Sequence, residues 1–467
     1  MNQIGVYGLG VMGKALATNL LNKGFRVGIY DRFPEVVAKV TNEVEGFHGF
    51  DSLEEFVSHL EKPRKIIVMV TAGKPVDEVI SQLTPYLEEK DIIIDCGNSY
   101  YIDTESRQEQ LKDTIYFIGC GVSGGEEGAL KGPSIMPSGS LEAYTSVEPF
   151  LKAIAAKNED GTCCCDYVGN HGAGHFVKMV HNGIEYAEMQ LIAEFYSLLK
   201  EEGYNNLEMS DIFAQLDKTE LSSYLLDITK DILKFEEEGE FLIDKISDVA
   251  KQKGTGKWTS EVAISNNIAI PSLINAVEVR FLSELADERK QASKIYQVNE
   301  QKRISEKLSF ETLKEAMLYF RLSLNAQGFD LIAKVSNANH YNINLSKLAN
   351  IWQNGCIIKS ELVRKISTIL QDNHNTSLLL NEEYAQLLID TRESAKTVLG
   401  KVLGNDIYAP IMNSAYQHVL GYTSEQLPTN LIQGQRDYFG AHTYQRIDKQ
   451  GDFHTLWDIG NKNSCEK

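Results

Sequence analysis

The stretch IGVYGLGVMG, residues 4–13, contains a GxGxxG motif directly after a short apolar strand pattern. An apolar helix pattern follows over residues 14–22, and a second strand pattern ends at Tyr30 and Asp31. In such a turn the first glycine allows the tight bend, the second lets a pyrophosphate approach the backbone, and the third lets the helix pack close to the strand. Strand, glycine turn, helix and second strand in this order predict a dinucleotide-binding βαβ unit.

The first third of the chain continues this alternation of strand and helix patterns. Short apolar runs occur at Ile4–Tyr7, Arg26–Tyr30, Lys65–Val70, Asp91–Asp95 and Ile115–Ile118. Repeated β-α units predict an α/β fold with a doubly wound, parallel, Rossmann-type sheet over residues 1–172. The stretch from residue 118 to residue 139 is so rich in glycine that we expect irregular structure there, which would offer backbone N–H groups and Ser123 to a ligand.

A different pattern begins near residue 172. Residues 173–430 show helical periodicity and almost no strand signal, which predicts a large all-α domain. The triplet LIA occurs at Leu191–Ala193 and again at Leu331–Ala333, which favours an internal duplication, although chance produces matches this short as well. Residues 431–467 are aromatic-rich and weakly periodic, so we expect a C-terminal arm that needs a surface to lie on.

The composition of the 467 residues, with 43% hydrophobic and 24% charged side chains, is that of an ordinary globular protein. A net charge of −19 argues against nucleic acid as a partner, and the apolar runs are too short to span a membrane. The N-terminal stretch lacks a signal-peptide pattern, so we expect a cytoplasmic location with reduced thiols. The run of cysteines at residues 163–165 lacks the spacing of a metal site, and we expect no metal.

The stretch GAGHFVKMVHNGIEY, residues 172–186, carries the strongest chemical signal in the sequence. Five of its side chains, spaced i, i+3, i+4, i+7 and i+8, share one helix face: Lys178, His181, Asn182, Glu185 and Tyr186. Such a stripe is normally apolar, whereas this one carries a base, an acid and three hydrogen-bonding groups. An exposed polar face is the alternative, but solvent faces rarely favour His, Asn and Tyr over Lys and Glu. The pattern therefore indicates a functional site.

The stretch KGTGKW, residues 253–258, has the composition of a phosphate cradle, with two cations, a hydroxyl and permissive backbone. A plain turn is the alternative, and the GxxxxGK spacing of a Walker A loop is absent. Because a chain of charge −19 repels anions at long range, binding a sugar phosphate requires local cations. The candidates for this role are Lys178, Lys253, Arg280 and Arg436.

Further motifs extend along the whole chain: GLGVMG (8–13), DCGNS (95–99), GVSGGEEGA (121–129), GAGHFVKMVHNGIEY (172–186), QKGTGKW (252–258) and QRDYFGAH (435–442). Together they resemble the decarboxylating 6-phosphogluconate dehydrogenases of the pentose phosphate pathway. The resemblance implies oxidative decarboxylation of 6-phospho-D-gluconate to D-ribulose 5-phosphate and CO2. It also implies that residues 173–430 bind substrate and form a homodimer, and that residues 431–467 reach into the partner subunit, so that the active sites are shared.

The resemblance gives each matched residue a role. Lys178 would be the general base and Glu185 the general acid. The carboxylate and hydroxyls of the substrate would be held by Asn98, Ser123, Gly124, Gly125, His181 and Asn182, its phosphate by Tyr186, Lys253, Thr255 and Arg280, and Arg436 and His442 would come from the neighbouring subunit. The cofactor would lie against Gly8, Leu9, Gly10, Val11, Met12, Gly13, Asp31, Arg32, Phe33, Val70, Thr71, Ala72 and Asn98.

The choice of cofactor stays open at this point. NADP is the default of the family, and Arg32 is the cation expected beside a 2′-phosphate. Asp31 points the other way, because a carboxylate at the end of the second strand suits the ribose diol of NAD and repels a phosphate. Phe33 also stands where many members of the family have a threonine, and it lacks the hydroxyl that a threonine would offer. We expect either NADP use with weak discrimination or a preference for NAD.

Two other functions are compatible with parts of the sequence. Another β-hydroxyacid dehydrogenase would share the first domain and a catalytic lysine, but it is usually much shorter and lacks QRDYFGAH. A catalytically silent dinucleotide-binding or scaffold protein is the second alternative. The presence of both Lys178 and Glu185 argues against it.

Overall fold

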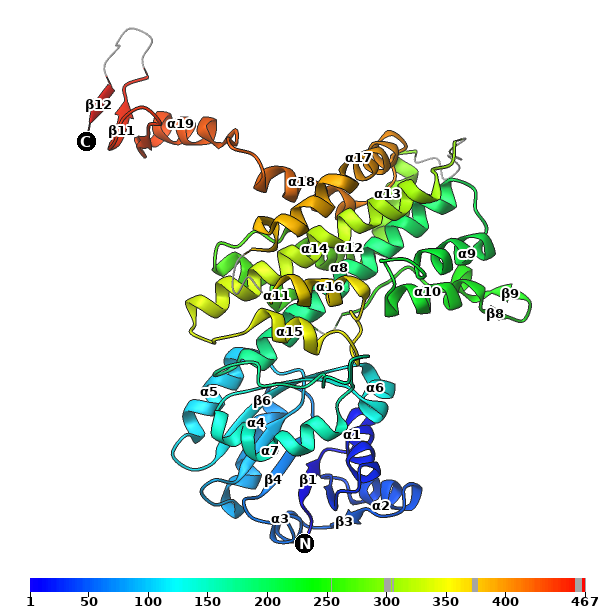
Figure 1. Ribbon diagram of the computed structural model, residues 1–467, viewed down its shortest axis with the longest axis vertical. Helices are drawn as coiled ribbons and strands as arrows, with labels where there is room; N and C mark the ends of the chain where they lie inside the picture. Colours follow the sequence, from blue (N-terminus) through cyan, green and yellow to red (C-terminus); the bar gives the residue numbers. More distant parts are fainter. Residues whose placement is uncertain (253, 298–303, 305, 372–376, 458–463, 467) are drawn as a thin grey trace. The chain divides into compact units, whose positions relative to one another are not determined.

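The structure is a computed structural model that describes residues 1–252, 254–297, 304, 306–371, 377–457 and 464–466 (Figure 1). The chain divides into two compact units, Met1–Tyr416 and Gln417–Lys467. The first unit contains the parallel sheet and the long helices, and the second contains the C-terminal segment. The domain boundaries at residues 172 and 430 stay predictions.

Parallel strands form the sheet in the order β3-β2-β1-β4-β5-β6, and β7 pairs antiparallel with β6. The strands are β1 (Ile4–Tyr7), β2 (Val27–Tyr30), β3 (His48–Gly49), β4 (Lys65–Val68), β5 (Ile92–Asp95), β6 (Tyr116–Ser123) and β7 (Ser134–Ser138). The strand order reverses between β1 and β4, which is the point where doubly wound sheets bind ligands at the carboxyl ends of their strands. The predicted fold class is confirmed.

The expectation of irregular structure over residues 118–139 is wrong. The stretch completes β6, forms α6 (Gly125–Lys131) and returns as β7. Glycine suits these elements because neighbouring segments come very close: a Cβ atom on Gly121 would lie 2.5 Å from the Cβ of Lys178. The glycines in this stretch therefore allow close packing instead of forming a loop.

Helices cover both faces of the sheet. They are α1 (Val11–Asn22), α2 (Pro34–Glu43), α3 (Leu53–Ser58), α4 (Lys74–Leu83), α5 (Tyr101–Leu111) and α7 (Leu141–Ile154). Successive strand side chains enter different cores: Ile92 and Ile94 of β5 pack in the core with α1 and α7, and Ile93 packs in the core with α3 and α4. Burial on both faces explains why the strands read as continuous apolar runs.

The helical part is built around two long helices, α8 (Ala173–Glu201) and α14 (Phe310–Ala338). Helix α8 begins against β6 and β7 and continues into contacts with α11, α12 and α14 (Figure 1). The remaining elements are α9 (Asn206–Leu216), α10 (Tyr224–Lys234), β8 (Glu236–Glu237), β9 (Glu240–Phe241), α11 (Thr255–Ser265), α12 (Pro271–Glu284), α13 (Ala286–Ile295), α15 (Leu345–Ile351), α16 (Glu361–Ile369), α17 (Glu382–Gly404) and α18 (Pro410–Tyr422). The catalytic candidates therefore lie on the helix that links sheet and helices.

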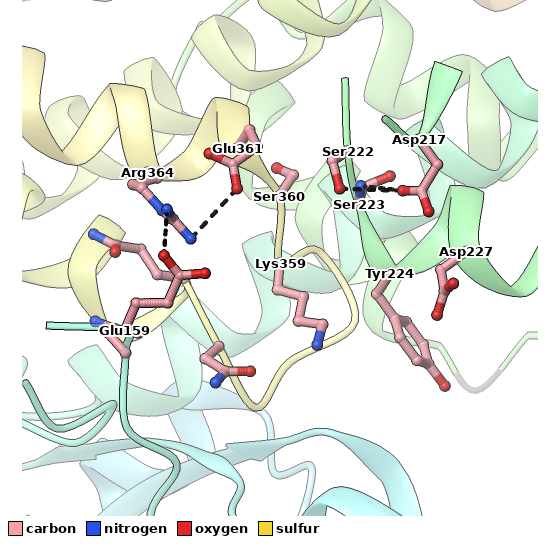
Figure 2. Close-up of a pocket in the computed structure, with 13 residues that line it drawn as sticks. Glu159, Asp217, Ser222, Ser223, Tyr224, Asp227, Lys359, Ser360, Glu361 and Arg364 are labelled. Carbon is pink, nitrogen blue, oxygen red and sulfur yellow. Dashed lines mark hydrogen bonds and ion pairs between the residues drawn. The ribbon is translucent and has the colours of Figure 1, made fainter. Parts of the chain in front are cut away.

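The helix order repeats, which supports the predicted internal duplication. One long helix and two shorter ones, α8-α9-α10, are followed by α14-α15-α16, and both long helices have 29 residues. The two halves join symmetrically: the Tyr224 N–H donates to the Lys359 carbonyl, and the Glu361 N–H donates to the Ser222 carbonyl. A polar cavity of about 340 Å³ lies at this junction (Figure 2).

A buried ion pair ties the two long helices together. The Arg321 guanidinium of α14 lies 3.0 Å from the Glu188 carboxylate of α8, and both residues are 2% exposed. Arg321 also donates to the Leu221 carbonyl, and the Asn325 amide donates to Glu188. These contacts compensate for the desolvation of two charges inside the helical core.

The second unit contains α19 (Thr429–Gly440) and a small sheet of β10 (Tyr444–Gln445), β11 (Asp452–Thr455) and β12 (Ser464–Glu466). Its strands pair antiparallel, with Tyr444 opposite Phe453. The carboxylate of Asp437 on α19 accepts hydrogen bonds from the residues that follow the helix. The predicted arm is thus a folded element with its own hydrogen-bond network.

No helix among the described residues combines the length and the apolar character that crossing a bilayer requires.

The buried ion pair gives a stability prediction. We expect Arg321→Met to lower the free energy of unfolding by about 3–5 kcal/mol, because it leaves the Glu188 carboxylate buried without its cation. The double variant Arg321→Met, Glu188→Gln should recover part of this loss. Chemical denaturation of both variants measures the effect, and Lys396→Met, at an exposed pair with Glu393, serves as the control. A loss below about 1 kcal/mol for Arg321→Met would show that the pair contributes little.

Candidate active site

Lys178 lies on the buried face of α8 where this helix passes the end of β6. The residue is 7% exposed, and its Nζ lies 2.5 Å from Asn182 Oδ1 one turn further along the helix. The backbone of β6 can approach because residue 121 is a glycine. The amine is therefore held at a fixed position away from bulk water.

A chain of hydrogen bonds extends from Lys178 to three other predicted site residues. His181 Nδ1 lies 3.2 Å from Asn182 Oδ1, and Ser123 Oγ lies 3.3 Å from His181 Nε2. The Asn182 amide donates to Thr255 Oγ1 at 3.1 Å. Because Asn182 Oδ1 accepts from His181, we assign the ring proton to Nδ1, which leaves Nε2 to accept from the Ser123 hydroxyl.

The surroundings shift the proton affinities of this cluster in a consistent direction. Burial lowers the pKa of Lys178, although the Glu185 carboxylate acts against this shift. Burial and the charge of Lys178 hold the pKa of His181 well below its usual range. The site therefore favours a neutral imidazole and makes the neutral amine accessible nearer to physiological pH than in an exposed lysine.

Glu185 and Tyr186 continue the same face of α8. Burial raises the pKa of Glu185, against the opposing charges of Lys178 and Arg280. The Arg280 guanidinium of α12 stacks on the Tyr186 ring at 3.6 Å and donates to the Lys251 carbonyl. A carboxyl group that can hold a proton thus lies near the amine, and a positioned cation lies near that carboxyl group.

The glycine turn after β6 passes close to the same cluster. Gly124 and Gly125 follow Ser123 with positive φ angles of 110° and 63°. A Cβ atom on Gly124 would meet the Gly355 carbonyl at 2.6 Å, whereas a Cβ atom on Gly125 would meet nothing within 4 Å. The turn is therefore packed on one side and open on the other.

The turn between β1 and α1 has the geometry that the sequence predicts. Gly8 has a φ of 94°, and a Cβ atom on Gly13 would lie 1.9 Å from the Gly8 carbonyl. A Cβ atom on Gly10 would have nothing within 4 Å, and no side chain caps the first turn of α1. Uncapped N–H groups at the start of a helix, above an open glycine, fit a pyrophosphate.

Asp31 closes this turn at the end of β2. Its carboxylate accepts from the Leu9 N–H at 2.8 Å and from the Phe33 N–H at 3.1 Å. Arg32 lies with its guanidinium 4.6 Å from the centre of the Phe33 ring. Since a carboxylate offers about four lone-pair sites, Asp31 keeps acceptor capacity for a ribose hydroxyl.

The loop after β5 carries Asn98, whose side chain is exposed. The buried Asp95 carboxylate shapes this loop by accepting from the Gly97 N–H and the Ser99 hydroxyl, and Arg107 of α5 lies 3.6 Å away. At the end of the loop, the Tyr100 ring packs 4.9 Å from the ring of Trp258 on α11. The loop of Asn98 is thus attached to the helix that carries Thr255.

The structure leaves some predicted site residues outside this cluster. Lys253 falls outside the described residues. Arg436 and His442 belong to the second unit, and Val70, Thr71 and Ala72 follow β4 at the nucleotide end of the sheet. Their roles stay predictions.

Sequence reasoning missed two residues that line the cluster. The Trp352 ring packs edge-on against the His181 ring at 5.5 Å. Cys356 lies close enough for its pKa, raised to about 12 by burial, to respond to the charges of Lys178 and Glu185. Neither residue belongs to a recognisable motif, and only the fold brings them to α8.

Sequence comparison agrees with this geometry. The NAD binding domain of 6-phosphogluconate dehydrogenase matches residues 3–169, and the C-terminal domain of 6-phosphogluconate dehydrogenase matches residues 174–457. Proteins named 6-phosphogluconate dehydrogenase, decarboxylating, from Staphylococcus epidermidis and Staphylococcus aureus are 44% and 45% identical over 462 residues, which is 97% of this chain and 99% of each relative.

Structural comparison gives the same result. A solved structure of Plasmodium falciparum 6-phosphogluconate dehydrogenase, studied in its apo form and in complex with NADP+ and with 6-phosphogluconate, is similar with a TM-score of 0.94. It is 35% identical and aligns over 97% of this chain and 100% of that chain. The match covers the sheet, the long helices and the C-terminal segment. The chain therefore belongs to the decarboxylating 6-phosphogluconate dehydrogenase family.

Proposed function

We propose that this protein oxidises and decarboxylates 6-phospho-D-gluconate to D-ribulose 5-phosphate and CO2, with NADP as the hydride acceptor. The observation that carries the proposal is the buried Lys178, held by Asn182 within a hydrogen-bonded cluster that includes His181, Ser123 and Thr255. Each of these residues occupies the position that the family motif assigns to it.

The first step is proton removal by Lys178. In its neutral form, which burial favours, the amine takes the proton of the C3 hydroxyl. A dinucleotide whose pyrophosphate is held at the glycine turn between β1 and α1 would supply the oxidant, because its nicotinamide ring would take up the hydride released from C3. Asn182, which receives a hydrogen bond from Nζ, keeps the amine directed at one position during this transfer.

The second step is loss of CO2 from the resulting 3-keto acid. The carbonyl at C3 is β to the carboxylate and accepts the electron pair of the breaking C1–C2 bond. The ammonium of Lys178, protonated in the first step, stabilises the developing enolate oxygen. A neutral His181, which accepts from Ser123 and donates to Asn182, adds no second positive charge that would compete for this role.

The third step is protonation of the enediol. Glu185 lies one turn beyond His181 on α8, and its raised pKa lets the carboxyl group carry a proton. We infer that it donates this proton to the carbon that lost CO2. Arg280, stacked on Tyr186, would hold the phosphate at the far end of the substrate together with Thr255 and Lys253.

The choice between NADP and NAD depends on two neighbouring residues. NADP agrees with the relative solved with NADP+, and Arg32 is available for a 2′-phosphate. NAD is the second candidate, because the Asp31 carboxylate at the end of β2 favours a ribose diol. At roughly 4 Å and an effective dielectric near 20, each unit of like charge costs about 4 kcal/mol before screening.

We also propose a homodimer with active sites shared between subunits. The second unit exposes large apolar side chains on α19, with Leu431 66% and Phe439 73% exposed. Several large apolar side chains left exposed on one helix favour a protein interface. The second copy of the chain is the partner that the family resemblance implies, and the cytoplasmic location stays a prediction.

One assay tests the proposed function against the alternatives. Incubation with 6-phosphogluconate and either NADP or NAD should give reduced cofactor and CO2 in equal amounts. Another β-hydroxyacid dehydrogenase would reduce cofactor with a different acid and release no CO2. A silent dinucleotide-binding protein would do neither.

The first prediction concerns Lys178→Met. This variant should bind 6-phosphogluconate but lose on the order of 10²–10⁴-fold in kcat, because the methionine cannot accept the C3 proton. Steady-state rates and calorimetric binding measure the two effects. Lys200→Met, at an exposed position on the same helix, is the matched control and should keep wild-type kcat. A Lys178→Met enzyme with near wild-type kcat would remove Lys178 from the mechanism.

The second prediction concerns Asp31→Asn. Removing the carboxylate should raise kcat/KM for NADP relative to NAD by at least about tenfold, since the repulsion of the 2′-phosphate disappears. The control Glu35→Gln removes one exposed negative charge from the neighbouring α2 and should leave the ratio within about twofold. If the ratio stays constant in Asp31→Asn, the carboxylate serves the backbone of the turn and does not select the cofactor.

The third prediction concerns shared sites. Arg436→Ala should weaken substrate binding by about 1.5–3 kcal/mol, the contribution of a hydrogen bond to a charged group. Mixing Lys178→Met subunits with Arg436→Ala subunits should restore about half of the sites in each heterodimer, because one site then has both residues intact. Heterodimers that form but regain no activity would mean that each site is built from a single chain.

A further inference from the structure

Asp437 is a fully buried carboxylate in a segment with few buried side chains. The residue is 0% exposed, and each of its two oxygens accepts two hydrogen bonds. Oδ1 accepts from the Thr443 N–H at 3.0 Å and from His454 Nδ1 at 2.9 Å. Oδ2 accepts from the Thr455 N–H at 3.0 Å and from Trp457 Nε1 at 2.8 Å.

These four donors keep the carboxylate charged. Burial by itself raises the pKa of Asp437, but the hydrogen bonds from Thr455, His454 and Trp457 outweigh it and lower the pKa to about 2. The group is thus an anion at any physiological pH. It joins the end of α19, the turn that follows, and β11 through one charge.

The turn that Asp437 holds contains two non-glycine residues in the left-handed region. Ala441 has a φ of 49° and Thr443 a φ of 59°, and His442 lies between them. Such residues persist when their surroundings determine the backbone. Here the Ala441 N–H donates to the Asp437 carbonyl, and the Thr443 N–H donates to the Asp437 carboxylate.

Arg436 is attached to the same turn through Gln433. Arg436 Nη1 donates to Gln433 Oε1 at 3.2 Å, and Gln433 Nε2 donates to the Thr443 carbonyl at 2.6 Å. His442 packs its ring 5.8 Å from the ring of Phe439. The two residues of this segment that are expected to bind substrate, Arg436 and His442, therefore depend on the geometry of one turn.

Apolar packing does not replace this network within the second unit. Tyr438 and Phe439, next to Asp437 on α19, are 70% and 73% exposed. Phe453 of β11, at 6% exposed, packs with Tyr444. The Trp457 ring also lies 6.3 Å from the Tyr438 ring and 6.2 Å from the Tyr444 ring, so the polar network joins the turn to α19 and β11 together with these aromatic contacts.

We infer that Asp437 is a positioning residue for substrate binding: it fixes the turn that presents Arg436 and His442 to the phosphorylated substrate. This inference rests on the proposed function, in which those two residues bind 6-phosphogluconate. It adds a residue that touches no substrate itself and acts through the backbone. The inference applies whether Arg436 and His442 complete the active site of their own subunit or that of the partner subunit.

Asp437→Asn tests the inference. An amide can accept at one oxygen, but its NH2 group then faces two of the four donors, so the turn should loosen. We expect KM for 6-phosphogluconate to rise at least about tenfold, while KM for NADP stays within about threefold. Hydrogen exchange at the Thr443 and Thr455 amides should become faster. Asp452→Asn, an exposed acid on β11, makes the same charge change and is the control.

A milder variant covers the case in which Asp437→Asn disrupts the whole segment. Trp457→Phe keeps the carboxylate and an aromatic ring but removes one donor, and it should raise the same KM by about threefold. Unchanged KM for 6-phosphogluconate in both variants, with an active wild type, would overturn the inference and leave the proposed function intact. A wild type that fails to oxidise 6-phosphogluconate would overturn the proposed function first and this inference with it.

Discussion

The hydrogen bond between the Lys178 amine and the Asn182 amide oxygen is the contact on which the site depends. An amine buried to this degree loses its hydration, and the fold must supply a replacement partner without fixing a positive charge. Asn182 does this because its oxygen accepts from Lys178 whether the amine is neutral or charged. The same oxygen also accepts from His181 Nδ1. This hydrogen bond determines the tautomer of the imidazole and leaves its Nε2 to accept from the Ser123 hydroxyl.

Close approach of backbones makes this burial feasible. The strand β6 passes against α8 where Gly121 faces Lys178, and the turn at Gly124 passes against the Gly355 carbonyl. The first of these contacts covers the base of the Lys178 side chain. Trp352 and Cys356, which arrive from the second half of the helical part, close another side. The burial of Lys178, His181 and Asn182 on α8 is thus a consequence of how tightly its neighbours pack.

Much of the fold was predictable, because the decisive signals are local. The strand, the GxGxxG turn and the helix are consecutive, and the five-residue face of α8 follows from helical spacing alone. The prediction of irregular structure over residues 118–139 was wrong, because a glycine that allows close packing and a glycine that belongs to a loop cannot be told apart by composition. The approach of Trp352 to His181 was not predictable from a local pattern, since the two residues are far apart in sequence. Arg436 was a candidate phosphate ligand by its charge alone, and its assignment to the neighbouring subunit together with His442 came from the family resemblance.

The repeated helix order has a consequence for how this chain can change over time. Both long helices have the same length and are buried along most of it, they meet through the Arg321–Glu188 pair, and the candidate catalytic side chains lie on α8. In the proposed function α8 supplies the catalytic side chains, and α14 supports them through the Arg321–Glu188 pair. A substitution in α14 should therefore lower mainly the free energy of unfolding. A substitution on the face of α8 that carries Lys178 should lower mainly kcat. Helix α14 should therefore tolerate apolar substitutions that preserve packing volume. The face of α8 that carries Lys178 should tolerate only a few residue types.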